Sequence, residues 1–177
     1  PFTVPMFLAS SPGGVETALA AVLRAHVGHE EELVVMCCDA AAKLCATPDG
    51  AARFGGAGFC KLLVSVLQTH LENITVCLSA LQLLAWLSKS PANTSHLGSR
   101  PLCKAVVGVT QKYFLRKRCT EAGCAVIRSL ASGSDSTRLL LIAEGAIDLL
   151  TVILHTYASK RSSAPAWAHA TMSFLTT

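Results

Sequence analysis

Residues 58–68, Gly-Phe-Cys-Lys-Leu-Leu-Val-Ser-Val-Leu-Gln, align without a gap with residues 101–111, Pro-Leu-Cys-Lys-Ala-Val-Val-Gly-Val-Thr-Gln. Working outward, the alignment extends to four anchors separated by 44, 43 and 44 residues: Gly14, Gly58, Pro101 and Gly145. A repeat of this length without a strand pattern predicts stacked helical units, each too small to bury its own apolar face. Such a stack presents a long surface, which is typical of binding rather than of catalysis.

The last segment of each unit carries apolar or small residues at positions i, i+3, i+4 and i+7. This spacing places them on one face of a helix. The four sets are Cys37, Ala40, Ala41, Leu44; Ala80, Leu83, Leu84, Leu87; Gly123, Val126, Ile127, Leu130; and Ala168, Thr171, Met172, Leu175. We expect the final leucine of each set to occupy an equivalent position, and the first three of these leucines to be buried.

Two further helices complete each unit. One long helix follows each anchor, over residues 15–25, 59–69, 102–112 and 146–157, and is apolar on more than one face. A short helix precedes the anchor, with Asp49 and Ser136 as predicted N-caps and with an apolar residue four positions before the anchor. These apolar residues are Phe54, Leu97 and Leu141. The predicted units span residues 1–56, 57–99, 100–143 and 144–177.

Composition supports closely packed helices and argues against a membrane span. The 177 residues are 51% hydrophobic, 15% charged and only 6% aromatic. The most apolar stretch, residues 62–87, is interrupted by Gln68, Glu72 and other polar side chains, so no run of about 18 uncharged apolar residues exists. Because the chain starts without Met and ends within an expected helix, we expect it to be part of a longer protein.

The eight cysteines are expected to be free thiols. Most of them lie among apolar residues at helical spacing, and no CxxC pair exists. Buried thiols behave as small hydrophobes, and their survival implies a reducing compartment. The sequence therefore predicts a cytoplasmic, intracellular location. Asn73 and Asn93 begin glycosylation sequons, a motif that is short and common by chance.

Residues 136–154 closely resemble an armadillo repeat. The resemblance lies in Ile142-Ala143-Glu144-Gly145-Ala146-Ile147 followed by Leu149-Leu150, and it extends over about residues 10–177. It implies an all-α fold: a right-handed α-solenoid of about four armadillo-type three-helix repeats. HEAT repeats are the close alternative, although the elbow at Gly145 favours armadillo. A four-helix bundle would not need the recurring elbow.

The resemblance also implies a concave groove lined by the last helix of each repeat, in which armadillo proteins hold extended peptides. The groove residues it implies here are Asp39, Lys43, Gln82, Trp86 and Ser129. The asparagine ladder of importin-α is missing, which argues against an import receptor. Two simpler interpretations stay open: Trp86 as an aromatic packed at a repeat junction, and Asp39 with Lys43 as a surface ion pair.

Charge divides the chain into two halves. Residues 1–100 have a net charge of −1 and residues 101–177 a net charge of +5. The imbalance concentrates in the loops between the long helices, and the predicted basic edge consists of Arg116, Lys117, Arg118, Lys160 and Arg161. Such an edge fits an acidic peptide, a phosphate or an anionic membrane surface. Nucleic acid is not expected as a partner, and a purely solvated edge is the alternative.

The sequence carries no recognisable catalytic motif, neither a phosphate-binding glycine loop nor a nucleophile elbow. His26 and His29 beside Glu30 are a poor zinc signature without cysteine partners. We therefore expect no enzyme activity, cofactor or metal. The function expected is a protein-interaction scaffold that binds a partner protein or peptide along the groove. The alternative is a regulatory or substrate-recognition repeat segment of a larger multidomain enzyme such as a ligase, kinase or hydrolase.

Overall fold

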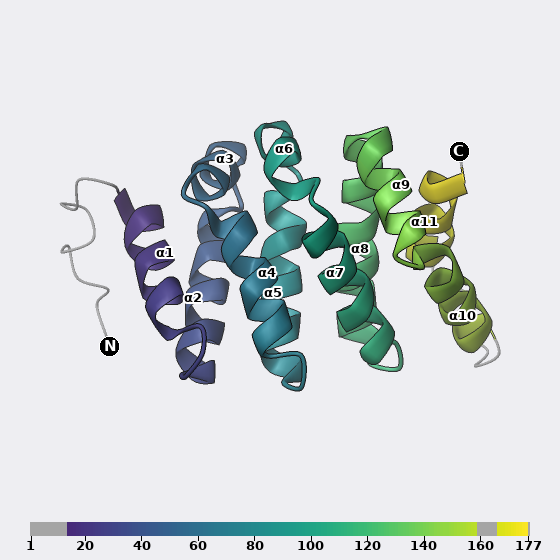
Figure 1. The fold of residues 1–177 in the computed structure, drawn as a ribbon, viewed down its shortest axis with the longest axis horizontal. Helices are drawn as coiled ribbons and strands as arrows, with labels where there is room; N and C mark the ends of the chain where they lie inside the picture. Colours follow the sequence, from purple (N-terminus) through teal and green to yellow (C-terminus); the bar gives the residue numbers. More distant parts are fainter. Residues whose placement is uncertain (1–13, 159–165, 177) are drawn as a thin grey trace.

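The computed structural model describes residues 14–158 and 166–176. Over these residues the chain forms eleven α-helices, one 3₁₀ helix and no strand, which confirms the all-α prediction. The helices are α1 (Gly14–His26), α2 (Glu31–Leu44), α3 (Pro48–Gly56), α4 (Phe59–Thr69), α5 (Ile74–Leu87), η2 (Pro91–Asn93), α6 (Thr94–Leu97), α7 (Arg100–Lys112), α8 (Lys117–Gly133), α9 (Asp135–Ala143), α10 (Ala146–Ala158) and α11 (Ala166–Thr176). Figure 1 shows these helices as a row of units along the long axis.

The predicted order of one short and two long helices is present. It recurs as α3–α4–α5, as α6–α7–α8 with η2 at its start, and as α9–α10–α11, while α1 and α2 form the first described unit. The last helix of each unit, which we call the third helix, packs against the third helices of its neighbours: α2 on α5, α5 on α8, and α8 on α11. The chain is therefore an α-solenoid.

No single helix among the described residues is both long and apolar enough to cross a membrane. Two bent helix pairs, α3–α4 and α9–α10, meet that standard only by their combined length and composition.

Glycine forms the predicted elbow between short and long helix in two units. Gly58 and Gly145 have φ angles of 88° and 87°, in the left-handed region that a side chain disfavours. At these residues the chain bends by 74° between α3 and α4 and by 69° between α9 and α10. In the α6–α7–α8 unit the anchor Pro101 lies instead in the first turn of α7, where its missing N–H needs no partner.

The N-caps of the short helices are not the predicted ones. Thr47 caps α3 by accepting a hydrogen bond from the Gly50 amide at 3.1 Å, and Ser134 caps α9 by accepting from the Thr137 amide at 3.2 Å. The predictions of Asp49 and Ser136 were therefore wrong by two residues. In α3 the reason is Pro48, which suits the first helical position and so starts the helix earlier.

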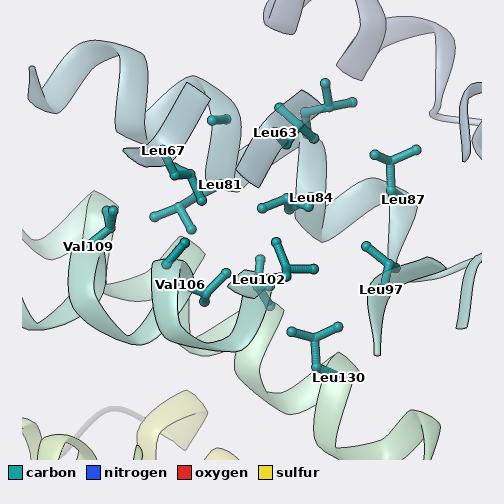
Figure 2. Packing of buried hydrophobic residues seen from close by; sticks show 14 of the residues in the cluster. Leu63, Leu67, Leu81, Leu84, Leu87, Leu97, Leu102, Val106, Val109 and Leu130 are labelled. Carbon is teal, nitrogen blue, oxygen red and sulfur yellow. The ribbon is translucent and has the colours of Figure 1, made fainter. Parts of the chain in front are cut away.

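A continuous apolar core runs through all the units, and the three apolar residues predicted four positions before the anchors belong to it. Figure 2 shows Leu84 of α5 facing Leu102 and Val106 of α7 in this core. Of the equivalent leucines, Leu87, Leu130 and Leu175 are buried. Leu44 is 45% exposed, so its predicted burial was wrong.

Leu44 is exposed because α2 has a described third helix on one side only. Leu87 and Leu130, at the same position of α5 and α8, belong to third helices that pack between two others. Met36, also on α2, is 67% exposed, whereas Ser79 at the equivalent position of α5 is buried. The uncovered side of α2 is thus the side on which a preceding third helix would pack.

A hydrogen bond between neighbouring units recurs at the end of the second helix. Each time, a side chain there reaches a backbone carbonyl in the corresponding turn of the preceding unit. The three pairs are His70 Nε2 with Val27 O at 2.6 Å, Tyr113 OH with Leu71 O at 2.8 Å, and Tyr157 OH with Phe114 O at 3.1 Å. These bonds satisfy carbonyls that the turns leave without a helical partner and hold the units in register.

Asn93 makes a second kind of link between units. Its side chain is 1% exposed, and its amide nitrogen donates to the carbonyls of Ala51 and Leu87, each at 2.9 Å. This close approach of the Asn93 side chain to α3 requires a glycine at position 55, because a Cβ there would lie 1.8 Å from the Asn93 Oδ1 atom. Asn93 therefore ties α3 to the end of α5.

All eight cysteines are free and buried, as the sequence predicted. Burial raises the pKa of the thiols of Cys38, Cys45, Cys77 and Cys124 to about 12. The pKa values of Cys60, Cys103 and Cys119 are raised to about 11 by the same cause. The reactive thiolate is therefore scarce at neutral pH.

We predict that Leu87→Ala lowers the free energy of unfolding by about 2 to 5 kcal/mol, because it opens a cavity in the core. The matched substitution Leu44→Ala, in the equivalent but half-open position, should cost less than about 1 kcal/mol. Urea unfolding followed by circular dichroism measures both values. Equal losses in the two variants would contradict the register of the units.

We also predict that native protein reacts slowly with a thiol reagent such as DTNB at pH 8, and that denaturation releases all eight thiols. Reaction should accelerate only as the pH approaches the raised thiol pKa values or as the chain opens. Rapid labelling of most thiols in the native state would contradict the packing of these side chains.

Candidate functional site

An open hollow of about 410 Å³ lies between the third helices α5 and α8. We call it the α5–α8 trough. Three of the predicted groove residues, Gln82, Trp86 and Ser129, line it together. Its floor includes Ala85, Ala122 and Ala125, whose small side chains leave the space between the helices open. The sequence prediction of these groove positions therefore corresponds to an actual depression on the third-helix face.

Trp86 and Lys89 contact each other on the α5 side of the trough. The Lys89 Nζ atom lies 3.7 Å from the centre of the Trp86 ring, within the range of a cation–π interaction. Trp86 is half-buried and packs against the core, and its ring also lines the trough. The ring face also holds the lysine ammonium group at the trough.

Two arginines line the α8 side of the same trough, Arg118 and Arg128. Among the described residues, no carboxylate lies within ion-pair distance of either arginine or of Lys89. The one acidic residue lining the trough, Glu121, is 3.9 Å from Lys117. The trough thus carries an excess of positive charge that the described residues do not neutralise.

Asp39 and Lys43, the remaining predicted groove residues, do not line this trough. They lie on α2, one unit earlier, where both side chains are exposed. A separation of 43 residues makes them the counterparts of Gln82 and Trp86. No ion pair between Asp39 and Lys43 is present in the described structure, so the surface-pair alternative has no support there.

The predicted basic edge is divided by the structure. Arg116 and Lys117 are exposed at the start of α8, whereas Arg118 lines the trough. Lys160 and Arg161 lie outside the described residues. The basic first turn of α8 has no acidic residue, although the positive end of a helix dipole favours one. Arg118 joins the edge to the trough, a link that the sequence did not predict.

Acidic side chains from residues 1–100 form contacts between neighbouring units. Glu31 accepts a hydrogen bond from Asn73 Nδ2 at 2.6 Å and lies 3.5 Å from His70 Nδ1. Glu72 pairs with Lys112 of the next unit, and that hydrogen bond raises the pKa of Lys112. Glu31 and Glu72 therefore both contribute to joining the units.

A second hollow of about 290 Å³ adjoins the trough and shares Lys89 and Ser129 with it. Its lining is rich in hydroxyl groups, including those of Ser88, Thr94 and Thr137. Lys89 thus stands where the two hollows meet. Sequence reasoning missed Lys89 and Arg128. Lys89 lies three positions after Trp86, which is a helical spacing, whereas Arg128 directly precedes Ser129.

Neither the weak metal signature nor the sequons gain support. Within residues 14–158 and 166–176, no cluster of three or more metal-binding side chains exists; His26 instead lies 3.3 Å from Glu30. The Asn93 amide is buried in hydrogen bonds, and the Asn73 oxygen caps α5 while its nitrogen donates to Glu31. The Asn93 amide is therefore inaccessible in this fold, and the Asn73 amide is engaged in hydrogen bonds.

No protein-family model and no curated protein matches the chain. Among solved structures, it is similar to a designed armadillo repeat protein, with a TM-score of 0.73 and 19% identity over 92% of this chain and 65% of that one. An engineered protein gives a TM-score of 0.74 and 14% identity over 92% of this chain and 62% of that one. The chain therefore spans less than two thirds of either structure. At these identities the likeness concerns the fold: the chain has an armadillo-like repeat fold.

We predict that Arg118→Gln and Arg128→Gln each change the free energy of unfolding by less than about 0.5 kcal/mol, because neither arginine has a carboxylate partner to lose. Urea titrations of the two variants measure the changes. A loss above about 1 kcal/mol for either variant would mean that the arginine supports the fold and is not available to a partner.

Proposed function

We propose that this chain is a protein-interaction scaffold that holds a segment of a partner protein along the third-helix face. The observation that carries the proposal is the α5–α8 trough, where an aromatic ring and three cations surround a floor of alanines. Central aromatic and arginine side chains in a depression are typical of binding hot spots. The armadillo-like repeat fold supports protein partners in general.

The charge of the trough favours a partner with acidic segments. Lys89, Arg118 and Arg128 attract carboxylates, and the exposed Arg116 and Lys117 extend the positive field to the edge. Asp39 and Lys43 offer a further part of the same face, one unit away. The buried free thiols support a reducing location, and we propose that the protein acts in the cytoplasm.

The test begins with capture of partners from a cell lysate by the immobilised chain, in parallel with Trp86→Ala, Arg116→Ala and Leu139→Ala variants. Leu139, which is 64% exposed on α9, is the matched apolar truncation away from the third-helix face. A groove partner should be lost with Trp86→Ala and retained with the other two variants. Circular dichroism of each variant establishes that it is folded.

We predict that Trp86→Ala weakens the affinity for a captured, purified partner by about tenfold or more, because the substitution removes an anchor and releases Lys89. Arg116→Ala should weaken it by less than about threefold and mainly slow association, as expected of a rim charge. Isothermal titration and stopped-flow measurements separate the two effects. If Trp86→Ala leaves the affinity unchanged while reversing Arg116, Lys117 and Arg118 abolishes binding, the functional surface is the loop edge.

A further inference from the structure

The cations of the α5–α8 trough stand at its two ends. Arg118 and Arg128 are ten residues apart on α8, which corresponds to about 15 Å along the helix axis. Lys89 belongs to the Arg128 end: the 43-residue offset between α5 and α8 places it level with Ser132, one helical turn beyond Arg128. One end therefore presents one cation and the other end presents two.

The space between the cations contains a strip of small apolar side chains, and the polar side chains of Gln82 and Ser129 also line it. Ala85, Ala122 and Ala125 line it, and Trp86 forms its α5 wall. Glu121, near the single-cation end, lies beside Lys117. A segment lying along the trough thus meets positive charge beside Glu121, then the alanines with Gln82 beside them, then positive charge again.

An extended peptide segment can place acidic side chains at both groups of cations if these side chains are four residues apart. Extended chain rises about 3.3 Å per residue and alternates its side chains between two faces. Side chains at i, i+2 and i+4 share a face, and i to i+4 covers about 13 Å. The span from i to i+4 is thus about 2 Å shorter than the distance between Arg118 and Arg128 along the helix axis. The flexible side chains of the two arginines can cover this difference.

We propose that the α5–α8 trough binds an extended partner segment in which two acidic residues at i and i+4 flank a small or β-branched apolar residue at i+2. One carboxylate meets Arg118, and the other meets Arg128 and Lys89. The i+2 side chain rests on the alanine floor. The segment lies along α5 and α8. This inference rests on the proposed function and specifies the chemistry of its partner.

The test uses synthetic fluorescein-labelled nonapeptides and the purified chain, with fluorescence anisotropy as the readout. The probe peptide holds two glutamates separated by Thr-Val-Thr. Two permuted peptides of identical composition place the glutamates side by side or at i and i+7. The probe should bind about threefold to fivefold more tightly than either permuted peptide, because each of these loses one exposed charge contact.

The protein variants are Arg118→Gln and Arg128→Gln, with Arg24→Gln as the matched control. Arg24 is exposed on α1, so the control makes the same charge change away from the trough. Each trough variant should weaken the probe by about threefold to fivefold, and the control by less than about 1.5-fold. Equal losses in all three variants would show a general electrostatic attraction and overturn the proposal.

A double-mutant cycle identifies the contacts. Each glutamate of the probe is replaced in turn by glutamine. In Arg128→Gln protein, one of the two peptide substitutions should lose most of its effect, with Lys89 retaining the remainder, while the other keeps its full effect. In Arg118→Gln protein the assignment should reverse. Independent, additive losses would contradict the paired arrangement, as would the absence of saturable binding of any peptide.

The outcome is separable from that of the proposed function. If Trp86→Ala abolishes capture of a protein partner but neither arginine variant affects it, the scaffold function stands and the acidic i, i+4 segment is wrong. If the probe shows the expected cycle while Trp86→Ala leaves every captured partner bound, the trough recognises the segment but is not the surface through which those partners bind.

Discussion

The structure depends on one constraint: the central third helix, α5, is too apolar to face water on either of the two sides that α2 and α8 cover. In α5, eight of the fourteen residues are buried, and the helix achieves this only between α2 and α8. Because no unit contains enough apolar surface of its own to cover such a helix, stability is shared between neighbours. On α2, which packs against one third helix among the described residues, Met36 and Leu44 are exposed.

The constraint also explains where the candidate site lies. Third helices that pack side by side turn one strip of each surface away from the core, and the alanines of α5 and α8 make this strip concave at one place. Charged side chains cannot point inward, so Arg118, Arg128 and Lys89 gather at the margins of that depression. A requirement of the core thus leaves an outer face on which charged and small side chains alternate.

The period and the helical spacing sufficed to predict the helices, the glycine elbows at Gly58 and Gly145 and the burial of Leu87. They did not predict the caps, because period and spacing do not fix where a helix starts: in α3 that position is set by Pro48, which follows Thr47. Gln82, Trp86 and Ser129 followed from their position in a family pattern. Lys89 and Arg128 did not, because the trough forms between two helices 43 residues apart and is not a property of either helix alone.

The hydrogen bonds from His70, Tyr113 and Tyr157 each reach back 42 or 43 residues. Their acceptors are backbone carbonyls, which every unit possesses whatever its side chains. Removing or duplicating one complete unit would therefore leave each donor facing an equivalent acceptor, whereas inserting a few residues within a unit would move the donor past it. The architecture tolerates changes of length in whole units, so the number of third helices along the outer face can vary without redesign of the joints between them.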